Sequence, residues 1–342
     1  MFYSDKIKIL FIVDYSTPIY TGLLSSYKKS FDKLNIKNEV FSFNINNQFL
    51  RVAKYNNFLL KSLVKKQQDI LISYIEKKSF SHIIVIKGSF LLAETIDYIK
   101  SKGIIISNIN PDNPFNTQSL ISSNYIIRET IKNYDFYFIW SKAIKNQIST
   151  IYPKLKVIYL PFAVDQSLIP TFNSNKIHYN YHISFIANAD NERKKVISRL
   201  LKDNFIYKNL NLFGDGWNNI NSINNPIKLI DINYFETIHQ SKININILRL
   251  QNKNSHNMRT FEIPACAGFM LHEYSEEADE FFKSGIEAEY FKTIEECIDK
   301  CHFYLKNENV RQKILMNGYE KTKQKSYSYL HRAETVLKSI TS

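Results

Sequence analysis

Short apolar runs alternate with amphipathic stretches through the first half of the chain. Residues 7–13 are almost continuously apolar, as expected for a strand that is covered on both faces of its sheet. Leu92, Ile96 and Ile99 share one helical face, and Gly103 follows as a C-terminal cap. Further buried strands are predicted at 83–86, 104–106, 136–140 and 157–160. This alternation predicts a parallel α/β sheet.

The second half of the chain repeats the scheme. Strands are predicted at 183–186, 210–213, 243–248, 269–271 and 289–291. A helix with one apolar face follows, carried by Ile294, Cys297, Ile298, Cys301 and Leu305. The alternation of strands and helices stops near residues 161–170, a segment that begins and ends with proline. The chain of 342 residues therefore predicts two α/β domains, 1–163 and 164–325, followed by a last helix within 326–342.

Composition restricts the cellular setting. The sequence has no run of about eighteen uncharged apolar residues that could cross a membrane. Its first residues lack the charged start, apolar stretch and cleavage site of a signal peptide. Its three cysteines show no disulfide pattern and favour a reducing compartment. We therefore expect a cytoplasmic protein.

The net charge of +13 raises the question of an anionic partner. The basic residues are scattered and no nucleic-acid module is recognisable, so we expect no nucleic-acid partner. Attraction to an anionic membrane surface fits, since each basic residue near such a surface contributes on the order of 1 kcal/mol. An acidic or pyrophosphate-bearing acceptor fits equally well. The third alternative is that the charge reflects a general richness in Lys and serves no partner.

Residues 257–271, with the sequence NMRTFEIPACAGFML, form the most informative stretch. Small residues at a helix start allow close approach to a ligand. Glu262 can accept hydrogen bonds from sugar hydroxyls, and Arg259 can contact a phosphate with two parallel hydrogen bonds. The structural alternatives are a Glu that stabilises a first helical turn and an Arg in a surface ion pair.

This stretch resembles the donor site of GT-B glycosyltransferases, most closely the CgeB-like branch of spore maturation proteins. Residues 160–165 (LPFAVD), 184–188 (SFIAN) with Arg193, and 212–217 (LFGDGW) resemble the same branch. The resemblance covers roughly residues 80–335. It implies two Rossmann-like domains facing a cleft, with a C-terminal helix that crosses back to the N-terminal domain. It also implies transfer from a nucleotide sugar, most commonly a UDP-sugar, to a glycan, lipid-linked or protein acceptor.

The resemblance assigns roles to four residues of the donor site. Glu262 matches the Glu that binds the nucleotide ribose, and Arg259 is expected on the diphosphate. Arg193 and Lys194 follow the first strand of the second half, where relatives place a basic residue on the leaving phosphate. Neutralising departing charge is a major source of catalysis. We therefore expect Arg193 and Arg259 to be catalytic, without a metal or another cofactor.

The remaining donor-site expectations are less specific. Relatives carry a second Glu that would fall at Asn254, so Ser255, His256 and Asn257 are expected to supply the sugar contact instead. Gly214 and Gly216 allow the backbone to pass close to the nucleotide base or the diphosphate. Trp217 is expected to pack against this turn. Gly22 resembles the glycine of a loop whose N–H groups face the donor phosphates. The wider relatives mostly retain the anomeric configuration, so the resemblance weakly favours retention.

On the acceptor side, Asp112 lies in the segment 110–115, NPDNPF, which resembles an Asp-Asp/Asn-Pro segment of the CgeB-like branch. Asp112 could contact the acceptor hydroxyl or act as a base. A plain turn is the alternative, because Asp, Asn and Pro are turn formers. Lys87 and Gly88 end another strand and could line the same cleft.

Two other functional classes stay open at this point. Without the second acidic residue, the chain could be a non-catalytic GT-B domain that binds a nucleotide or glycan within a surface-polysaccharide or modification complex. It could also be a nucleotide-sugar epimerase on the same fold. Metal binding is not expected, because no Asp-x-Asp pair follows a strand, and Cys297 and Cys301 lie on an apolar helical face.

Overall fold

The structure, a computed structural model, describes residues 7–14, 18–45, 56–116, 123–170, 178–217 and 233–342. The chain divides into two compact domains. The N-terminal domain comprises residues 1–161 together with 329–342, and the C-terminal domain comprises residues 162–328. Among the described residues, no helix is long and apolar enough to span a bilayer.

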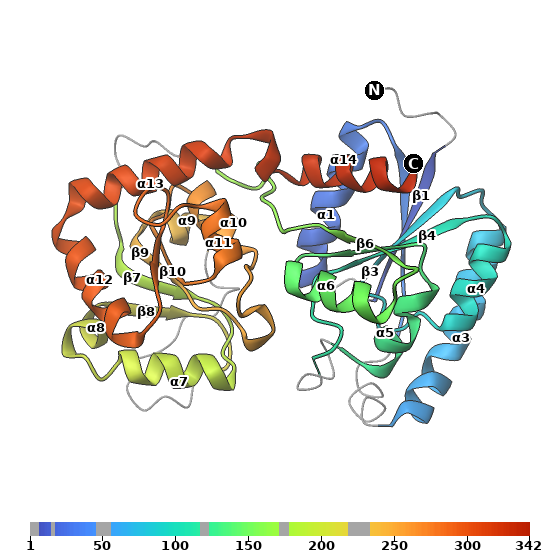
Figure 1. Cartoon of the computed structure of the whole chain (residues 1–342), viewed down its shortest axis with the longest axis horizontal. Helices are drawn as coiled ribbons and strands as arrows, with labels where there is room; N and C mark the ends of the chain where they lie inside the picture. Colours follow the sequence, from blue (N-terminus) through green and yellow to red (C-terminus); the bar gives the residue numbers. More distant parts are fainter. Residues whose placement is uncertain (1–6, 15–17, 46–55, 117–122, 171–177, 218–232) are drawn as a thin grey trace. The chain divides into compact units, whose positions relative to one another are not determined.

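The N-terminal domain contains a six-stranded parallel sheet in the order β2-β1-β3-β4-β5-β6. Figure 1 shows α3 and α4 on one side of this sheet, and α1 and α14 on the other. The strands are β1 (Lys8–Val13), β2 (Lys37–Ser42), β3 (His82–Ile86), β4 (Ile105–Asn110), β5 (Phe136–Ile139) and β6 (Lys156–Tyr159). The helices are α1 (Pro18–Lys33), α3 (Asn57–Glu76), α4 (Ala93–Ser101), α5 (Tyr125–Thr130), η1 (Ile131–Asn133), α6 (Lys142–Ile151) and α14 (Tyr329–Ile340).

The C-terminal domain contains a five-stranded parallel sheet in the order β11-β10-β9-β7-β8. Its strands are β7 (Tyr181–Ile186), β8 (Leu210–Phe213), β9 (Ser241–Asn246), β10 (Met270–Glu273) and β11 (Glu289–Phe291). Its helices are α7 (Asn191–Leu200), α8 (Asn204–Asn209), α9 (Tyr234–His239), η3 (Leu250–Asn252), α10 (Arg259–Ala265), α11 (Glu276–Phe281), α12 (Ile294–Lys306), α13 (Glu308–Thr322) and η4 (Lys325–Tyr327). The predicted class of two Rossmann-like α/β domains is confirmed.

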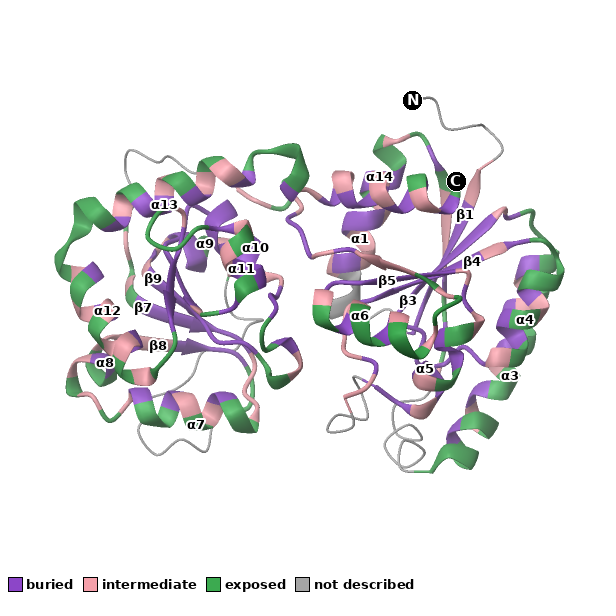
Figure 2. Cartoon of the chain, in the orientation of Figure 1, coloured by how far each residue is buried: buried purple, intermediate pink, exposed green. Residues whose placement is uncertain are grey.

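Burial explains which strands the sequence revealed. In Figure 2 the central strands of both sheets are buried and the outer faces of the helices are exposed. β3 is buried at every residue, so its apolar run is easy to recognise. The sequence analysis missed β2, which lies at the edge of its sheet. β2 begins with Lys37, Asn38 and Glu39 and has only one buried residue, so it lacks the apolar run of a central strand.

The last helix belongs to the N-terminal domain, as the fold class predicted. α14 packs on α1, where the rings of Tyr27 and Tyr329 meet edge to face with centroids 5.3 Å apart. Arg332 Nε donates a hydrogen bond to the carbonyl of Pro161 at 2.8 Å. This contact holds α14 against the end of segment 1–161 within the N-terminal domain.

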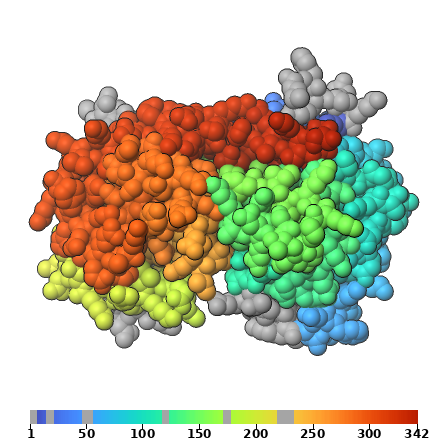
Figure 3. Space-filling view, viewed as in Figure 1, coloured from blue at the N-terminus to red at the C-terminus, as the bar shows by residue number. Residues whose placement is uncertain are grey.

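α3 is the longest described helix of the N-terminal domain and lies at its surface (Figure 3). Its buried face carries Leu60, Val64, Gln68, Leu71 and Ile75, which are spaced as expected for one helical stripe. Asn56 caps the helix by accepting hydrogen bonds from the N–H groups of Phe58 and Leu59. The N-terminal cap and the buried stripe together explain why this segment is helical.

Gly22 does not lie in a loop, which corrects the prediction that it follows β1 in a phosphate-binding turn. It is the fifth residue of α1, and a Cβ atom added to it would meet nothing within 4 Å. Residues 15–17, which precede the helix, lie outside the described residues. The helical backbone at position 22 therefore does not require a glycine.

Two helical glycines provide a matched test of the packing. Gly22→Ala should raise the free energy of unfolding by about 0.5–1 kcal/mol, because Ala loses less backbone freedom. Gly318→Ala in α13 should lower it by about 1–3 kcal/mol, because its Cβ would lie 2.4 Å from the carbonyl oxygen of Glu287. Urea denaturation of both variants measures the two effects. Equal effects would contradict the packing described here.

Candidate functional site

Three arginines gather at the carboxyl edge of the C-terminal sheet, where ligands bind in open α/β folds. Arg193 lies in the first turn of α7, Arg249 follows β9, and Arg259 begins α10. Their charges act on one another: burial first, and then repulsion from Arg259 and Arg249, lowers the pKa of Arg193 to about 8. Burial, opposed by Tyr234 and Glu262, lowers the pKa of Arg259. Such an edge favours a multiply charged anion.

Arg193 differs from its predicted role as an open phosphate ligand. Its side chain is 2% exposed, and its guanidinium donates to the backbone carbonyls of Asn188 at 3.2 Å and Ile247 at 3.1 Å. Arg193 therefore links the segments that follow β7 and β9, and it contributes positive charge to this edge from a buried position. Lys194, the next residue, is half-buried.

Arg249 is an exposed cation at this edge, and the sequence analysis did not select it. Its side chain is 45% exposed, and its Nε lies 3.5 Å from Asp190 Oδ2. Asp190 also caps α7 by accepting from the N–H of Arg193 at 2.9 Å. Arg249 lies in no recognisable motif, so its position after the β9 end was the one available signal.

Arg259 is held by a pair of amides. Asn246, the last residue of β9, and Asn257 exchange two side-chain hydrogen bonds of 3.1 and 2.9 Å. Arg259 Nε donates to the same Asn246 oxygen at 3.3 Å. Asn257 is 9% exposed, so it positions Arg259 and is not open to a sugar. This corrects its predicted role as a direct ligand.

Glu262 lies in the first turn of α10 and is half-buried. The hydroxyl of Tyr234, the first residue of α9, donates to Glu262 Oε2 at 2.7 Å. Burial raises the pKa of Glu262, while Tyr234 and Arg259 oppose the shift. Tyr234 was not predicted from sequence, because it approaches from a separate helix and carries no motif.

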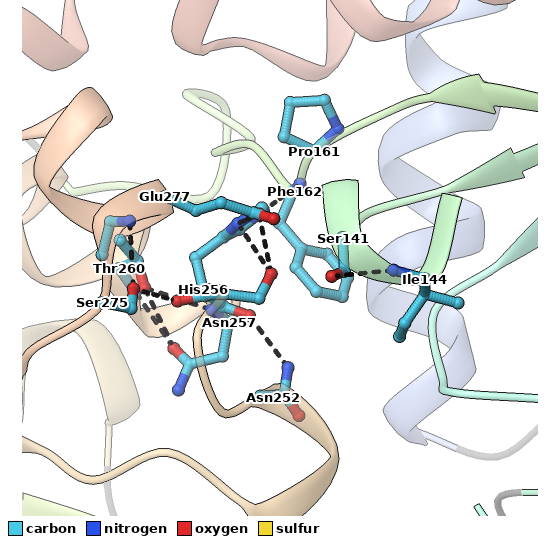
Figure 4. A network of polar contacts seen from close by, with 12 residues as sticks. Ser141, Ile144, Pro161, Phe162, Asn252, His256, Asn257, Thr260, Ser275 and Glu277 are labelled. Carbon is cyan, nitrogen blue, oxygen red and sulfur yellow. Dashed lines mark hydrogen bonds and ion pairs between the residues drawn. The ribbon is translucent and has the colours of Figure 1, made fainter. Parts of the chain in front are cut away.

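Ser255 and His256 are buried and bonded to protein groups, which corrects their predicted sugar contact. Figure 4 shows His256 inside a polar network with Glu277. His256 is fully buried; its Nε2 accepts from the N–H of Phe162 at 3.2 Å, and its Nδ1 lies 3.1 Å from Glu277 Oε2. Ser255 donates to the same oxygen at 2.8 Å. These groups fix the segment between η3 and α10. Asn254 beside them is exposed, at φ 62°.

Gly214 and Gly216 make a tight turn after β8. Gly214 has φ 137°, and a Cβ there would lie 2.2 Å from the carbonyl oxygen of Ala187, so only glycine fits. Gly216 has φ 83°. Trp217 is fully buried and donates from Nε1 to the same Ala187 carbonyl at 2.8 Å. The prediction that Trp217 packs this turn is confirmed.

In the N-terminal domain, Asp112 follows β4 and pairs with Lys87, which follows β3. Lys87 Nζ lies 3.1 Å from Asp112 Oδ2, and the two side chains are 2% and 19% exposed. The backbone N–H of Asp112 also donates to Asn110 Oδ1 at 2.9 Å. The segment is thus a turn, as the structural alternative held, and it also presents a carboxylate paired with a buried cation.

Asp14 directly follows β1, and the charges of Lys87 and Asp112 act on its carboxyl group. Its Oδ1 accepts from the N–H of Ser89 at 2.8 Å, and its buried Oδ2 has no hydrogen-bond partner among the described residues. Burial raises its pKa to about 6, against the attraction of Lys87 and the hydrogen bonds of Ser89, while Asp112 adds to the increase. The sequence signal was a polar residue at the end of an apolar strand.

The raised pKa of Asp14 has a measurable consequence for stability. Because the folded chain binds this proton more tightly than the unfolded chain, folded stability falls as the pH rises from about 4 through about 6. The total loss is about 3 kcal/mol, which corresponds to roughly two pKa units. Asp14→Asn should remove this dependence in urea denaturation between pH 4.5 and 7.5. Asp69→Asn, on the exposed side of α3, is the matched control. A difference between wild type and Asp14→Asn that is constant with pH would contradict the assignment.

Residues 192–338 match the model of the family described as Glycosyl transferase-like. No curated protein matched the sequence. Among solved structures, sucrose-phosphate synthase from Thermosynechococcus elongatus has a TM-score of 0.69 at 9% identity, covering 97% of this chain and 98% of that chain.

Two further solved structures contain nucleotide ligands. A mutant of TarM from S. aureus, in complex with fondaparinux, α-GlcNAc-glycerol and UDP, has a TM-score of 0.68 at 10% identity, covering 98% of this chain and 100% of that chain. HepE from Anabaena, in complex with UDP, has a TM-score of 0.61 at 11% identity, covering 98% and 100%. The chain therefore has the GT-B fold, and its C-terminal part is similar to the Glycosyl transferase-like family.

Proposed function

We infer that this protein is a glycosyltransferase that moves a sugar from a nucleotide-diphosphate sugar, a UDP-sugar, to a hydroxyl of a glycan, lipid-linked or protein acceptor. The observation that carries this proposal is the gathering of Arg193, Arg249 and Arg259 beside Glu262. Mutually repelling guanidinium groups are stabilised by a diphosphate, and an adjacent carboxylate suits ribose hydroxyls. The UDP complexes of proteins with similar folds support it.

The residues divide the work within the C-terminal domain. Arg249 and Arg259 contact the diphosphate, and the buried Arg193 adds positive potential behind them. Charge that develops on the leaving diphosphate is then stabilised by fixed cations, without a metal ion. Glu262, steadied by Tyr234, holds the ribose. Lys194 and the Gly214–Gly216 turn border this site.

Glu262→Ala should weaken UDP binding roughly ten- to a hundredfold, because hydrogen bonds to a charged group contribute about 1.5–3 kcal/mol. Tyr234→Phe should give a smaller loss, since it removes the hydroxyl that orients the carboxylate. Isothermal titration calorimetry with UDP measures both variants. Glu236→Ala, at an exposed position of α9, is the control. Unchanged UDP affinity in Glu262→Ala would remove Glu262 from the site.

Arg249→Ala should weaken the binding of UDP roughly tenfold and leave the binding of uridine unchanged, because the lost contact is to phosphate. The matched control is Arg199→Ala, another exposed arginine at the far end of α7, which pairs with Glu295. Calorimetry with both ligands separates the two contributions. Equal losses for UDP and uridine would place Arg249 away from the diphosphate.

A further inference from the structure

A cavity of about 820 Å³ lies at the amino edge of the N-terminal sheet, the edge at which its strands begin. Its lining includes Ile105 at the start of β4, Phe136 at the start of β5 and Ile340 at the end of α14. All of the residues that line it belong to the N-terminal domain. Its volume is within the range of roughly 300–1,000 Å³ that is typical of small-molecule sites.

Four lysines from separate elements line this cavity. They are Lys100 in the last turn of α4, Lys132 in η1, Lys154 in the loop before β6, and Lys156 at the start of β6. Lys100 is paired with Asp135, whose Oδ1 lies 2.9 Å from its Nζ. Lys132, Lys154 and Lys156 are exposed and have no ion-pair partner among the described residues. With four lysines against one aspartate, the lining side chains carry an excess of three positive charges.

The cavity also has an apolar lining. Phe136 and Ile340 are buried, and Lys156 Nζ lies 4.8 Å from the centroid of the Phe136 ring. Leu155 is partly exposed, and Ile151 at the end of α6 is 48% exposed. Exposed lysines around buried apolar side chains are complementary to a ligand that has both an anionic group and an apolar part.

A phospholipid fits these features better than a small free anion does. A free anion needs the lysines alone, whereas the exposed Ile151 and the apolar lining match the glyceride part of a lipid. Positive charge also continues along the same edge beyond the cavity, because Lys37 at the start of β2 and Lys102 after α4 are exposed. Clusters of lysines on one surface are typical of proteins that bind anionic lipids.

We propose that this cavity binds the phosphate group of an anionic phospholipid, and that the N-terminal domain docks in this way on an anionic membrane surface. Lys132, Lys154 and Lys156 contact the phosphate, while the apolar lining accommodates the glyceride part. The proposal does not depend on the function proposed above, because it uses residues of the amino edge alone. Asp14 and Asp112 lie at the carboxyl edge of the same sheet, so a lipid at the amino edge leaves them uncovered.

The first experiment measures co-sedimentation of the full chain with lipid vesicles. Vesicles of phosphatidylcholine and phosphatidylglycerol in equal amounts should bind the protein, and vesicles of phosphatidylcholine alone should not. The triple variant Lys132→Gln, Lys154→Gln and Lys156→Gln should bind roughly a hundredfold more weakly, because each lysine near an anionic surface contributes about fivefold. Lys154→Gln alone, in a loop, should lose about fivefold.

The matched control removes the same charge from the C-terminal domain. It carries Lys202→Gln, Lys208→Gln and Lys306→Gln, all at exposed positions, and it should keep most of the vesicle binding. An equal loss in this control would show that net charge attracts the vesicle, and it would overturn the proposed site. Thermal denaturation checks that each variant is folded, and Lys154→Gln decides the test if the triple variant is not.

The second experiment tests the cavity itself, by calorimetry with a water-soluble short-chain phosphatidylglycerol. The wild-type protein should bind this lipid saturably and more tightly than it binds glycerol phosphate or inorganic phosphate. Leu155→Trp leaves the charge unchanged but places an indole in the cavity, so it should abolish this binding.

The remaining outcomes identify other ligands. Inorganic phosphate that binds as tightly as the short-chain lipid would make the cavity a site for a free anion and would overturn the lipid proposal. Undiminished lipid binding by Leu155→Trp would place the lipid outside the cavity. An RNA oligonucleotide that binds the lysines and is not displaced by anionic vesicles would identify a nucleic-acid surface instead.

Discussion

The parallel arrangement of the strands is the constraint on which the rest of this structure depends. In a parallel sheet all carboxyl ends lie at one edge, so the residues that follow different strands meet there. Ile247 after β9 and Arg193 after β7 meet in one domain, while Asp14 after β1 and Ser89 after β3 meet in the other. Sequence separations of many tens of residues are thereby converted into contacts.

The two edges carry opposite excess charge. At the C-terminal edge, burial and the charges of Arg259 and Arg249 lower the pKa of Arg193. At the N-terminal edge, Lys87 pairs with Asp112 and also attracts the charge of Asp14. Each excess costs folding free energy in the absence of a ligand, because like charges are held close and partly desolvated. Strain of this kind is typical of sites that bind or react. A bound anion would relieve the first excess, and a proton on Asp14, whose pKa is raised to about 6 by burial, relieves the second.

Burial distinguishes side chains that are open to a ligand from side chains that only position them. Ser255, His256 and Asn257 looked like ligands because they follow Asn254, where relatives carry an acidic residue. They are, however, at most 9% exposed and bonded to protein groups. A buried polar group needs such partners. Their function is to fix the segment that presents Arg259 and Glu262.

The sequence by itself determined the two α/β domains and nearly all of the strands, because buried strands are apolar runs and glycine turns have few alternatives. It also predicted a donor site at residues 257–271. It did not reveal β2, whose polar edge position removes that signal. Only the tertiary structure decided that Tyr234 supports Glu262, that Arg249 is exposed while Arg193 is buried, and that Asp14 joins Lys87 and Asp112. Local patterns record the periodicity of burial, whereas the charge and exposure of a side chain depend on neighbours that chain folding brings from distant segments.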